Sequence, residues 1–241
     1  MDGFDPMDSF GPDVAAAYDD HLRGDEAETV SFLAALAGDG RALELAIGTG
    51  RIAIPLIERG VEVDGIEQSA AMTQRLHERR PDVAVVAGDM ATADAPAAAY
   101  SLVYLVFNTI GNILTQDGQV QCFENAGRHL AEDGVFVVEM TSPTVSIAGR
   151  TQFVEAERVA ADEVVLDVNR YDPVTQLLSE NHVTISAAGI TMGPIAQRIP
   201  FPSELDLMAR LAGLRLRDRF GGWQGEPFTA RSERHISVYA R

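Results

Sequence analysis

Nine residues near the start of the chain read Leu43-Glu44-Leu45-Ala46-Ile47-Gly48-Thr49-Gly50-Arg51. They predict a short buried strand that runs into a glycine turn, and the apolar residues after them predict a helix. A second run reads Val61-Glu62-Val63-Asp64-Gly65-Ile66-Glu67 and predicts a strand that ends on an acid. Together the segments indicate a nucleotide-binding βαβ unit, because glycines and a helix N-terminus let backbone N–H groups approach a ligand. Glu67 lies nineteen positions after Gly48, where a carboxylate can accept hydrogen bonds from both hydroxyls of a ribose.

Two classes of cofactor fit this unit. The pattern Gly48-x-Gly50-x-x-Ala53 fits a dinucleotide, so an NAD-dependent oxidoreductase is one interpretation. Glu44, four residues before Gly48, instead suits a ligand that carries an amino-acid ammonium. Asp89 follows the next strand-like run and can accept a hydrogen bond from an adenine amino group. Acids at three successive strand ends therefore favour a cationic adenosyl ligand.

The ordered set of motifs resembles the class I S-adenosylmethionine (SAM) dependent methyltransferases. Their first motif is acid-x-Gly-x-Gly-x-Gly, and this chain departs from it at the first glycine, which is Ala46. The resemblance covers roughly residues 25–140 by motif and the later strands by order. It implies SAM as cofactor and S-adenosylhomocysteine as product, with the ribose at Glu67, the adenine at Asp89 and Met90, and the methionine end near Glu44 and the two glycines. The residues expected at the cofactor are Tyr18, Glu44, Ala46, Gly48, Gly50, Arg51, Glu67, Gln68, Met72, Asp89, Met90 and Phe107.

The order of predicted elements indicates an α/β fold with a Rossmann-like, seven-stranded methyltransferase sheet and helices on both faces. After the fifth strand, the sequence alternates with period two from about Thr151 to Phe201, which predicts an inserted antiparallel β-meander. We expect a SAM-binding domain at residues 1–140 and 202–241, and a lid or dimerisation subdomain at 141–201. The chain closes with a predicted strand hairpin, which is the methyltransferase order, whereas a dinucleotide-binding fold would continue with parallel βα units.

Composition excludes several other functions. The 241 residues carry 36 Asp+Glu against 19 Lys+Arg, a net charge of −17 that repels nucleic acid. Cys122 is the single cysteine, so neither a disulfide framework nor a cysteine zinc site is expected, and the histidine spacings predict no metal site. The N-terminus lacks a signal-peptide pattern, and no apolar run approaches the ~20 residues of a membrane span. A cytoplasmic protein without membrane contact is expected.

The sequence carries no strong catalytic signature, and methyl transfer from a sulfonium needs mainly alignment and exclusion of water. The candidates are Asn112, which follows the fourth strand, Trp223 in the loop of the predicted terminal hairpin, and His235 at the start of its last strand. Asn112 can orient an amine by hydrogen bonding, and His235 is a candidate base or a structural strand residue. Trp223 is either a wall of the substrate site, stacking near the sulfonium, or a hydrophobic plug on the hairpin.

The segment Phe107-x-x-Ile110-Gly111 and the inserted sheet resemble the aminosugar N-methyltransferases and related small-molecule enzymes. Several of those enzymes have a histidine where this chain has Asn112, which leaves the proton acceptor and an aminosugar substrate open. The sequence thus predicts a SAM-dependent methyltransferase that acts on nitrogen or oxygen of a small molecule. An NAD-dependent oxidoreductase and a SAM-binding protein without transfer activity are the alternatives.

Overall fold

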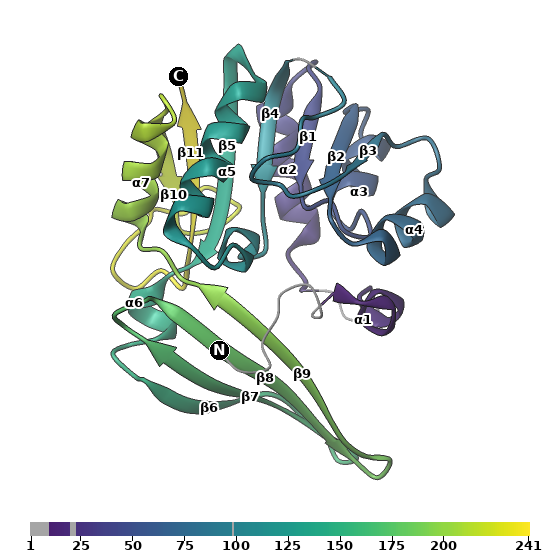
Figure 1. Cartoon of the computed structure of the whole chain (residues 1–241), viewed down its shortest axis with the longest axis vertical. Helices are drawn as coiled ribbons and strands as arrows, with labels where there is room; N and C mark the ends of the chain where they lie inside the picture. The colour runs from purple at the N-terminus through teal and green to yellow at the C-terminus, as the bar shows by residue number, and fades with distance from the viewer. Residues whose placement is uncertain (1–9, 20–22, 98) are drawn as a thin grey trace.

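Two separate sheets organise the chain, whose computed structural model describes residues 10–19, 23–97 and 99–241 (Figure 1). The larger sheet contains β1 (Ala42–Leu45), β2 (Val63–Glu67), β3 (Val85–Ala87), β4 (Tyr100–Leu105), β5 (Leu130–Thr141), β10 (Arg215–Phe220) and β11 (Arg234–Ala240). Its strand order is β10-β11-β5-β4-β1-β2-β3. The five strands from β3 to β5 are parallel, and β11 and β10 form the antiparallel hairpin at the edge. The predicted seven-stranded sheet and terminal hairpin are confirmed.

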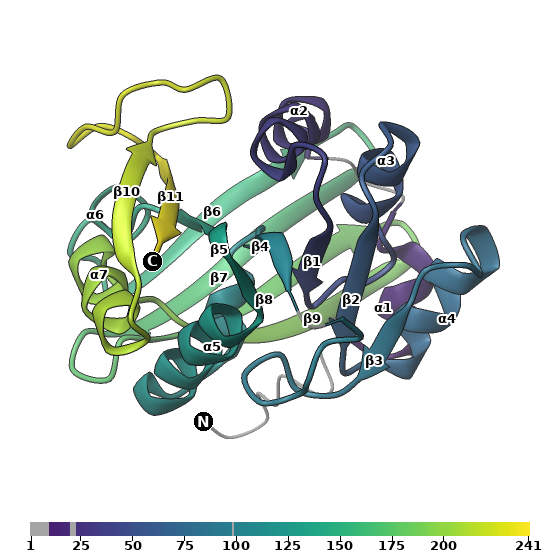
Figure 2. The same cartoon turned by 90° about the horizontal axis from the view of Figure 1, so that it is seen from above.

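Helices cover both faces of this sheet (Figure 2). The helices are α1 (Pro12–Ala17), α2 (Glu26–Ala37), α3 (Ala53–Glu58), α4 (Ala70–Arg79), α5 (Gln116–His129), α6 (Pro143–Ser146) and α7 (Pro202–Leu211), with a 3₁₀ turn η2 (Thr109–Asn112). Alternate residues of a buried strand enter opposite cores: Val103 of β4 packs on the α5 and α7 side, whereas Leu102 packs on the α2 and α3 side. Ser69 caps α4 by accepting a hydrogen bond from the backbone N–H of Met72.

The inserted sheet consists of β6 (Gln152–Val159), β7 (Glu163–Asp172), β8 (Leu177–Ser186) and β9 (Gly189–Arg198). All neighbouring pairs are antiparallel, as the period-two pattern predicts. The sheet lies across the carboxyl ends of the parallel strands (Figures 1 and 2). Buried Arg198 fixes its last strand, because the guanidinium donates to the side chains of Gln119 on α5 and Glu204 on α7. Gln119 in turn donates to the backbone carbonyls of Arg198 and Ile110.

The fourth strand ends earlier than the sequence predicts. A continuous apolar strand is expected over residues 102–107, but Phe107 and Asn108 both have a φ of 60°, in the left-handed region. Two consecutive residues in this conformation turn the chain from β4 into η2. The Asn108 side chain stabilises the turn, since its Oδ1 accepts a hydrogen bond of 2.6 Å from the backbone N–H of Thr141 at the end of β5.

None of the helices in the described parts of the chain is long and apolar enough to cross a membrane. The glycines, prolines and acids of residues 1–12 predict a loose leader, and residues 1–9 of it lie outside the described residues.

Candidate active site

The glycine turn after β1 leaves room for a ligand. Gly48 has a φ of 58°, and a Cβ added to it would meet no atom within 4 Å. Gly50 has a φ of 80°, and a Cβ there would collide with the side chain of Leu76, so this glycine is required for packing. Ala46 stands where the methyltransferase motif has a glycine and has a φ of 58°. Ala46 therefore adopts the left-handed backbone conformation that glycine adopts more easily.

Two buried carboxylates flank the turn. Glu67 at the end of β2 is 8% exposed and accepts hydrogen bonds from the backbone N–H groups of Gly48, at 2.9 Å, and Ser69, at 2.7 Å. Glu44 in β1 is 5% exposed and accepts a hydrogen bond of 2.8 Å from the hydroxyl of Tyr104 in β4. Burial raises the pKa of Glu44 to about 8, and the nearby Glu67 carboxylate contributes to the rise. Burial also raises the pKa of Glu67.

The chemistry of these groups fits SAM. Neither Glu44 nor Glu67 forms an ion pair with any residue that the structure describes. Buried carboxylates without a cationic partner are unfavourable in the ionised form. A ligand with a sulfonium and an ammonium would supply the positive charge, and free lone pairs on Glu67 can accept from hydroxyl groups.

The residues expected at the adenine surround the ends of β2 and β3. A cavity of about 580 Å³ begins at Glu67 and Gln68 and extends along α4. Asp89 is exposed after β3, and its Oδ1 accepts a hydrogen bond of 2.8 Å from the backbone N–H of Ala91. Met90 is partly buried against the core. Met72 is 2% exposed, so its side chain lies within the protein rather than at the surface of the cavity.

Three further residues expected at the cofactor lie together although they come from separate segments. The guanidinium of Arg51 lies 4.5 Å from the ring centroid of Tyr18 and 5.7 Å from that of Phe107. Arg51 also donates to the backbone carbonyl of Tyr18. Asp19, the residue after Tyr18, accepts a hydrogen bond of 2.8 Å from Thr49 in the glycine turn. The end of α1 is therefore attached to the turn that follows β1.

The three catalytic candidates do not lie together. Asn112 in η2 faces the inserted sheet, where its Oδ1 lies 3.5 Å from Nε2 of Gln197. His235 in β11 is fully buried, with Nδ1 3.0 Å from the Ser237 hydroxyl. Burial lowers the pKa of His235 to about 3, and the Arg219 charge adds to the effect. His235 is therefore neutral at physiological pH.

Trp223 lies on the other side of the sheet from His235. Its indole is 6% exposed and packs edge-on against Phe32 of α2, with ring centroids 5.4 Å apart. Trp223 shares its core with Ile236, and successive strand residues such as His235 and Ile236 face opposite sides. These contacts are those of a hydrophobic plug between the terminal hairpin and α2.

Comparison with known proteins identifies the family. A model described as a methyltransferase domain matches residues 42–134, which run from β1 into the start of β5. The structure of the CcbJ methyltransferase from Streptomyces caelestis is 36% identical in sequence, with a TM-score of 0.91, and the match covers 96% of this chain and 97% of that chain. The chain belongs to the SAM-dependent methyltransferases.

Other relatives agree with this assignment. The cypemycin N-terminal methyltransferase of a Streptomyces species is 27% identical over 207 residues, which are 84% of this chain and 84% of that protein. CalS10, an amino pentose methyltransferase from Micromonospora echinaspora, shares the fold at 24% identity, with a TM-score of 0.71 and coverage of 94% and 95%. SAM as cofactor and a small-molecule type of methyltransferase are therefore confirmed. The interpretation of the chain as an NAD-dependent oxidoreductase is therefore wrong.

One buried acid of this methyltransferase was missed in the sequence. The Glu139 side chain in β5 is 1% exposed and accepts a hydrogen bond of 2.6 Å from the backbone N–H of Phe107. Arg23 pairs with Glu139 at 3.0 Å, and its guanidinium lies 4.2 Å from the Phe107 ring centroid. Glu139 thus holds the backbone of the turn after β4. The sequence did contain a signal for this residue, because Glu139 is an acid inside an otherwise apolar predicted strand.

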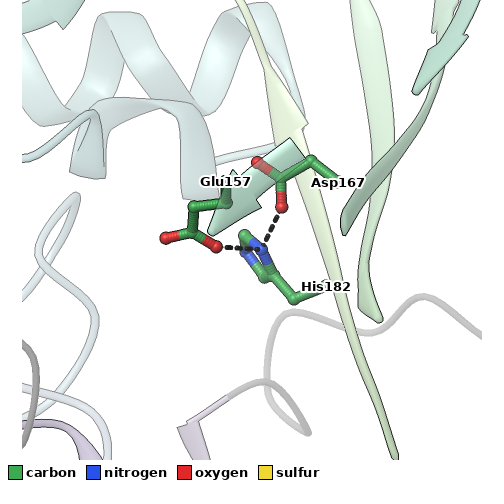
Figure 3. A group of neighbouring side chains, drawn as sticks. All are labelled: Glu157, Asp167 and His182. Carbon is green, nitrogen blue, oxygen red and sulfur yellow. Dashed lines mark hydrogen bonds and ion pairs between the residues drawn. The ribbon is translucent and has the colours of Figure 1, made fainter. Parts of the chain in front are cut away.

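A second group was missed because no sequence spacing connects its members. Asp167 and His182 lie opposite each other on β7 and β8, with Asp167 Oδ1 2.6 Å from His182 Nδ1 (Figure 3). Glu157 Oε2 lies 3.8 Å from the same nitrogen, and Glu180 Oε1 lies 3.1 Å from Nε2. Hydrogen bonds to Asp167 and Glu180 raise the pKa of His182 to about 10, so the imidazole is protonated near neutral pH. Potential metal ligands of Glu157, Asp167 and His182 lie within 4.8 Å of one another, which the histidine spacings did not predict.

Proposed function

We propose that this methyltransferase transfers the SAM methyl group to the nitrogen of a small-molecule amine. The observation that carries the proposal is the protonation state of two histidines, His235 in the larger sheet and His182 in the inserted sheet. His235 is neutral but fully buried, and its low pKa makes it a poor proton acceptor. His182 is already protonated and donates to carboxylates. An amine attacks as a neutral nucleophile and needs no strong base, whereas an alcohol needs one.

The cofactor contacts proposed from the sequence are compatible with the geometry. Glu67 would accept from the ribose hydroxyls, and Asp89 and Met90 would contact the adenine. Glu44 would face the methionine ammonium, with the open backbone of Gly48 beside it. Tyr18, Arg51 and Phe107 would cover the cofactor, because the three already lie together at the end of α1.

The protein's part in the chemistry is positioning. SAM, when bound, supplies a methyl group that its sulfonium activates. Asn112 would orient the acceptor, because Gln197 already holds the amide and Oδ1 keeps a second lone pair for an N–H donor. The amine nitrogen would use its lone pair to form the new N–C bond while the methyl–sulfur bond breaks and leaves S-adenosylhomocysteine, and the resulting ammonium would release its proton to solvent. The relatives support nitrogen, since one is named as an N-terminal methyltransferase and another as an amino pentose methyltransferase.

The test compares paired amine and alcohol acceptors of the same skeleton, with S-adenosylhomocysteine formation as the readout. We expect turnover with amines, and a pH dependence that follows the pKa of each acceptor amine. His235→Gln should keep that pH dependence, with circular dichroism as the control for folding. Turnover of alcohols alone, or loss of the pH dependence in folded His235→Gln, would show that the enzyme uses a base and methylates oxygen.

We also propose that the inserted sheet forms a homodimer through its outer face, the face turned away from the larger sheet. Strand pairing places these residues on the outer face: Val154, Ala156, Val159, Val164, Leu166, Val168, Asn181, Val183, Ile185, Ile190, Met192 and Pro194. Several are well exposed, including Val159 at 74% and Met192 at 67%. Such an apolar patch is typical of an interaction surface.

A second copy of the chain fits this face better than another partner. None of these twelve side chains is charged, and exposed Arg170 follows them on the same face, so two copies with a net charge of −17 can meet over this patch without burying carboxylates. Oδ1 of Asn181 is buried without a hydrogen-bond partner, and a second copy can supply the amide donor. Strand spacing of about 4.8 Å and row spacing of about 6.8 Å give a face of roughly 400 Å². This area is small for a specific interface, so we expect a weak dimer.

A further inference from the structure

The inner face of the inserted sheet, turned toward the carboxyl ends of the parallel strands, is polar where the outer face is apolar. Its first row of paired residues, Tyr171, Leu178 and Gln197, contacts the larger domain. The second row contains Phe153, Asn169, Glu180 and Ile195, and the third contains Glu155, Asp167, His182 and Gly193. The polar groups of the second and third rows therefore lie on the same face as the contact with Asn112.

The charges on this face leave an excess of negative charge. Glu155 is neutralised by Arg150, whose Nη1 lies 2.8 Å from its carboxylate. The carboxylates of Asp167, Glu180 and Glu157 instead share the single imidazolium of His182. Asp167 and Glu180 are largely shielded from water, with side chains 22% and 21% exposed. Partly buried carboxylates in excess over cations favour a positively charged ligand.

A second observation at the same place points to a hydrogen-bond donor. Asn169 is 5% exposed and lies directly opposite Glu180, on the face that carries Asp167 and His182. Its amide nitrogen donates to the backbone carbonyl of Asp167, but its Oδ1 is buried and has no hydrogen-bond partner. A buried acceptor without a donor is unfavourable, and a ligand N–H group would satisfy it.

We propose that Asp167, Asn169 and Glu180 form a subsite that holds a cationic amino group of the methyl acceptor. Each of the three offers an acceptor oxygen, and strand pairing puts them with His182 on the inner face of the inserted sheet. That sheet lies across the carboxyl ends of the parallel strands (Figure 1). Carboxylates and an amide oxygen match the three donors of an ammonium. The same surface repels a diphosphate, which makes a nucleotide-linked acceptor unfavourable.

The subsite restricts the acceptor further. An amine held between carboxylates stays protonated, and its lone pair is not available for attack. The group bound here is therefore an anchor, and the methylated nitrogen is a different one. We expect an acceptor with at least two amino groups, one bound by the inserted sheet and one presented near Asn112. This restriction rests on the amine methylation proposed above, whereas the subsite can be tested by binding alone.

The binding test uses the S-adenosylhomocysteine-loaded protein, titrated at fixed ionic strength with D-glucosamine and with N-acetyl-D-glucosamine. The two probes share a sugar ring, but only glucosamine carries an ammonium. In NMR spectra, we expect bound glucosamine to shift the resonances of the His182 ring. We expect the acetylated probe to bind at least about tenfold more weakly. His182→Gln assigns those resonances by their disappearance.

The variant Asp167→Asn/Glu180→Gln should weaken glucosamine binding about tenfold or more. Its matched control is Glu132→Gln/Asp133→Asn, which removes two exposed carboxylates at the start of β5, and binding there should stay within about twofold. The proposal is overturned if both probes bind equally, if glucosamine does not bind, or if the two double variants weaken binding equally. It is also overturned if Zn²⁺ binds with the His182 shift and glucosamine does not, since the cluster is then a metal site. None of these results depends on which acceptor atom is methylated.

Discussion

In the seven-stranded sheet the candidate functional acids lie close to the ends of strands, whereas in the inserted sheet they lie along one face. Glu44 and Glu67 interrupt or close apolar runs, next to a glycine turn that is visible in the sequence. Asp167 lies between two apolar residues of β7, whereas Glu180 lies between polar residues of β8, and the two come together only when β7 pairs with β8. A site at the ends of parallel strands can be recognised from local motifs, because the chain order gives the place of each turn. A site on an antiparallel face depends on register, and a shift of one residue would move every acid to the other face.

The largest expected effect concerns the buried acid of the first site. The folded-state pKa of Glu44 is about 8, above the ordinary value of 4.5, so ionisation of this group opposes folding. The cost is absent below pH 4.5, grows as the pH rises, and is complete above pH 8. Glu44→Gln removes it while keeping an acceptor for Tyr104. The variant should therefore gain about 3 kcal/mol of stability relative to the parent between pH 5 and pH 8.

Denaturant unfolding of the ligand-free protein at a series of pH values measures this difference. Asp64→Asn is not a suitable control, because Asp64 pairs with Arg41 and accepts from Tyr100. Asp117→Asn, which removes an exposed acid, is the control. If the Glu44→Gln gain is the same at pH 5 and pH 8, Glu44 does not titrate in this range.

The second effect tests the ribose contact. Glu67→Ala should weaken S-adenosylhomocysteine binding by about 2 kcal/mol, roughly thirtyfold, because charge-assisted hydrogen bonds are lost. Glu62→Ala, on the exposed approach to the same strand, should leave binding unchanged. Calorimetric titration measures both. Equal affinity in the Glu67 variant and the parent would move the ribose away from this carboxylate.

Much of the fold could be predicted because each element has a local signal. The glycine turn, the terminal hairpin and the period-two run after the fifth strand predicted the seven-stranded sheet and the inserted sheet. The end of β4 was not predicted, because the left-handed turn at Phe107 and Asn108 depends on a hydrogen bond to Thr141, 33 positions later. Local secondary-structure propensity cannot predict a contact between residues so far apart in the sequence.

The candidate site divides in the same way. The cofactor residues at strand ends were named from motifs, and the structure brings Tyr18, Arg51 and Phe107 together. The acceptor side was weakly specified, since Trp223 and His235 are adjacent to the same hairpin but face opposite sides of the sheet. The pairing of Asp167 with His182 depends on the register between β7 and β8, which the residue types do not predict.

The third effect separates the two faces of the inserted sheet. Ile190→Glu places a charge on the outer face, where the isoleucine is 65% exposed, and should weaken self-association about tenfold or more. Leu211→Glu is the matched control, because Leu211 is 70% exposed on α7 and lies outside the sheet. Sedimentation velocity over a range of concentrations measures the association. Monomeric parent protein at all concentrations, or equal weakening by both variants, would contradict a dimer through this face.

The smallest effect concerns Ala46, where the chain departs from the glycine of the methyltransferase motif. Its φ of 58° is unfavourable for a side chain with a Cβ by about 1 kcal/mol. Ala46→Gly should relieve that strain and stabilise the ligand-free protein by about 0.5–1 kcal/mol, measured by denaturant unfolding. Ala148, also left-handed with a φ of 48° but in the loop after α6, provides the control: Ala148→Gly should stabilise by a similar amount without changing cofactor affinity. If Ala46→Gly is destabilising, the Ala46 methyl group makes packing contacts that outweigh the strain. If it instead changes affinity for S-adenosylhomocysteine and not stability, the alanine acts on the cofactor directly, and the first site is more specialised than its motif indicates.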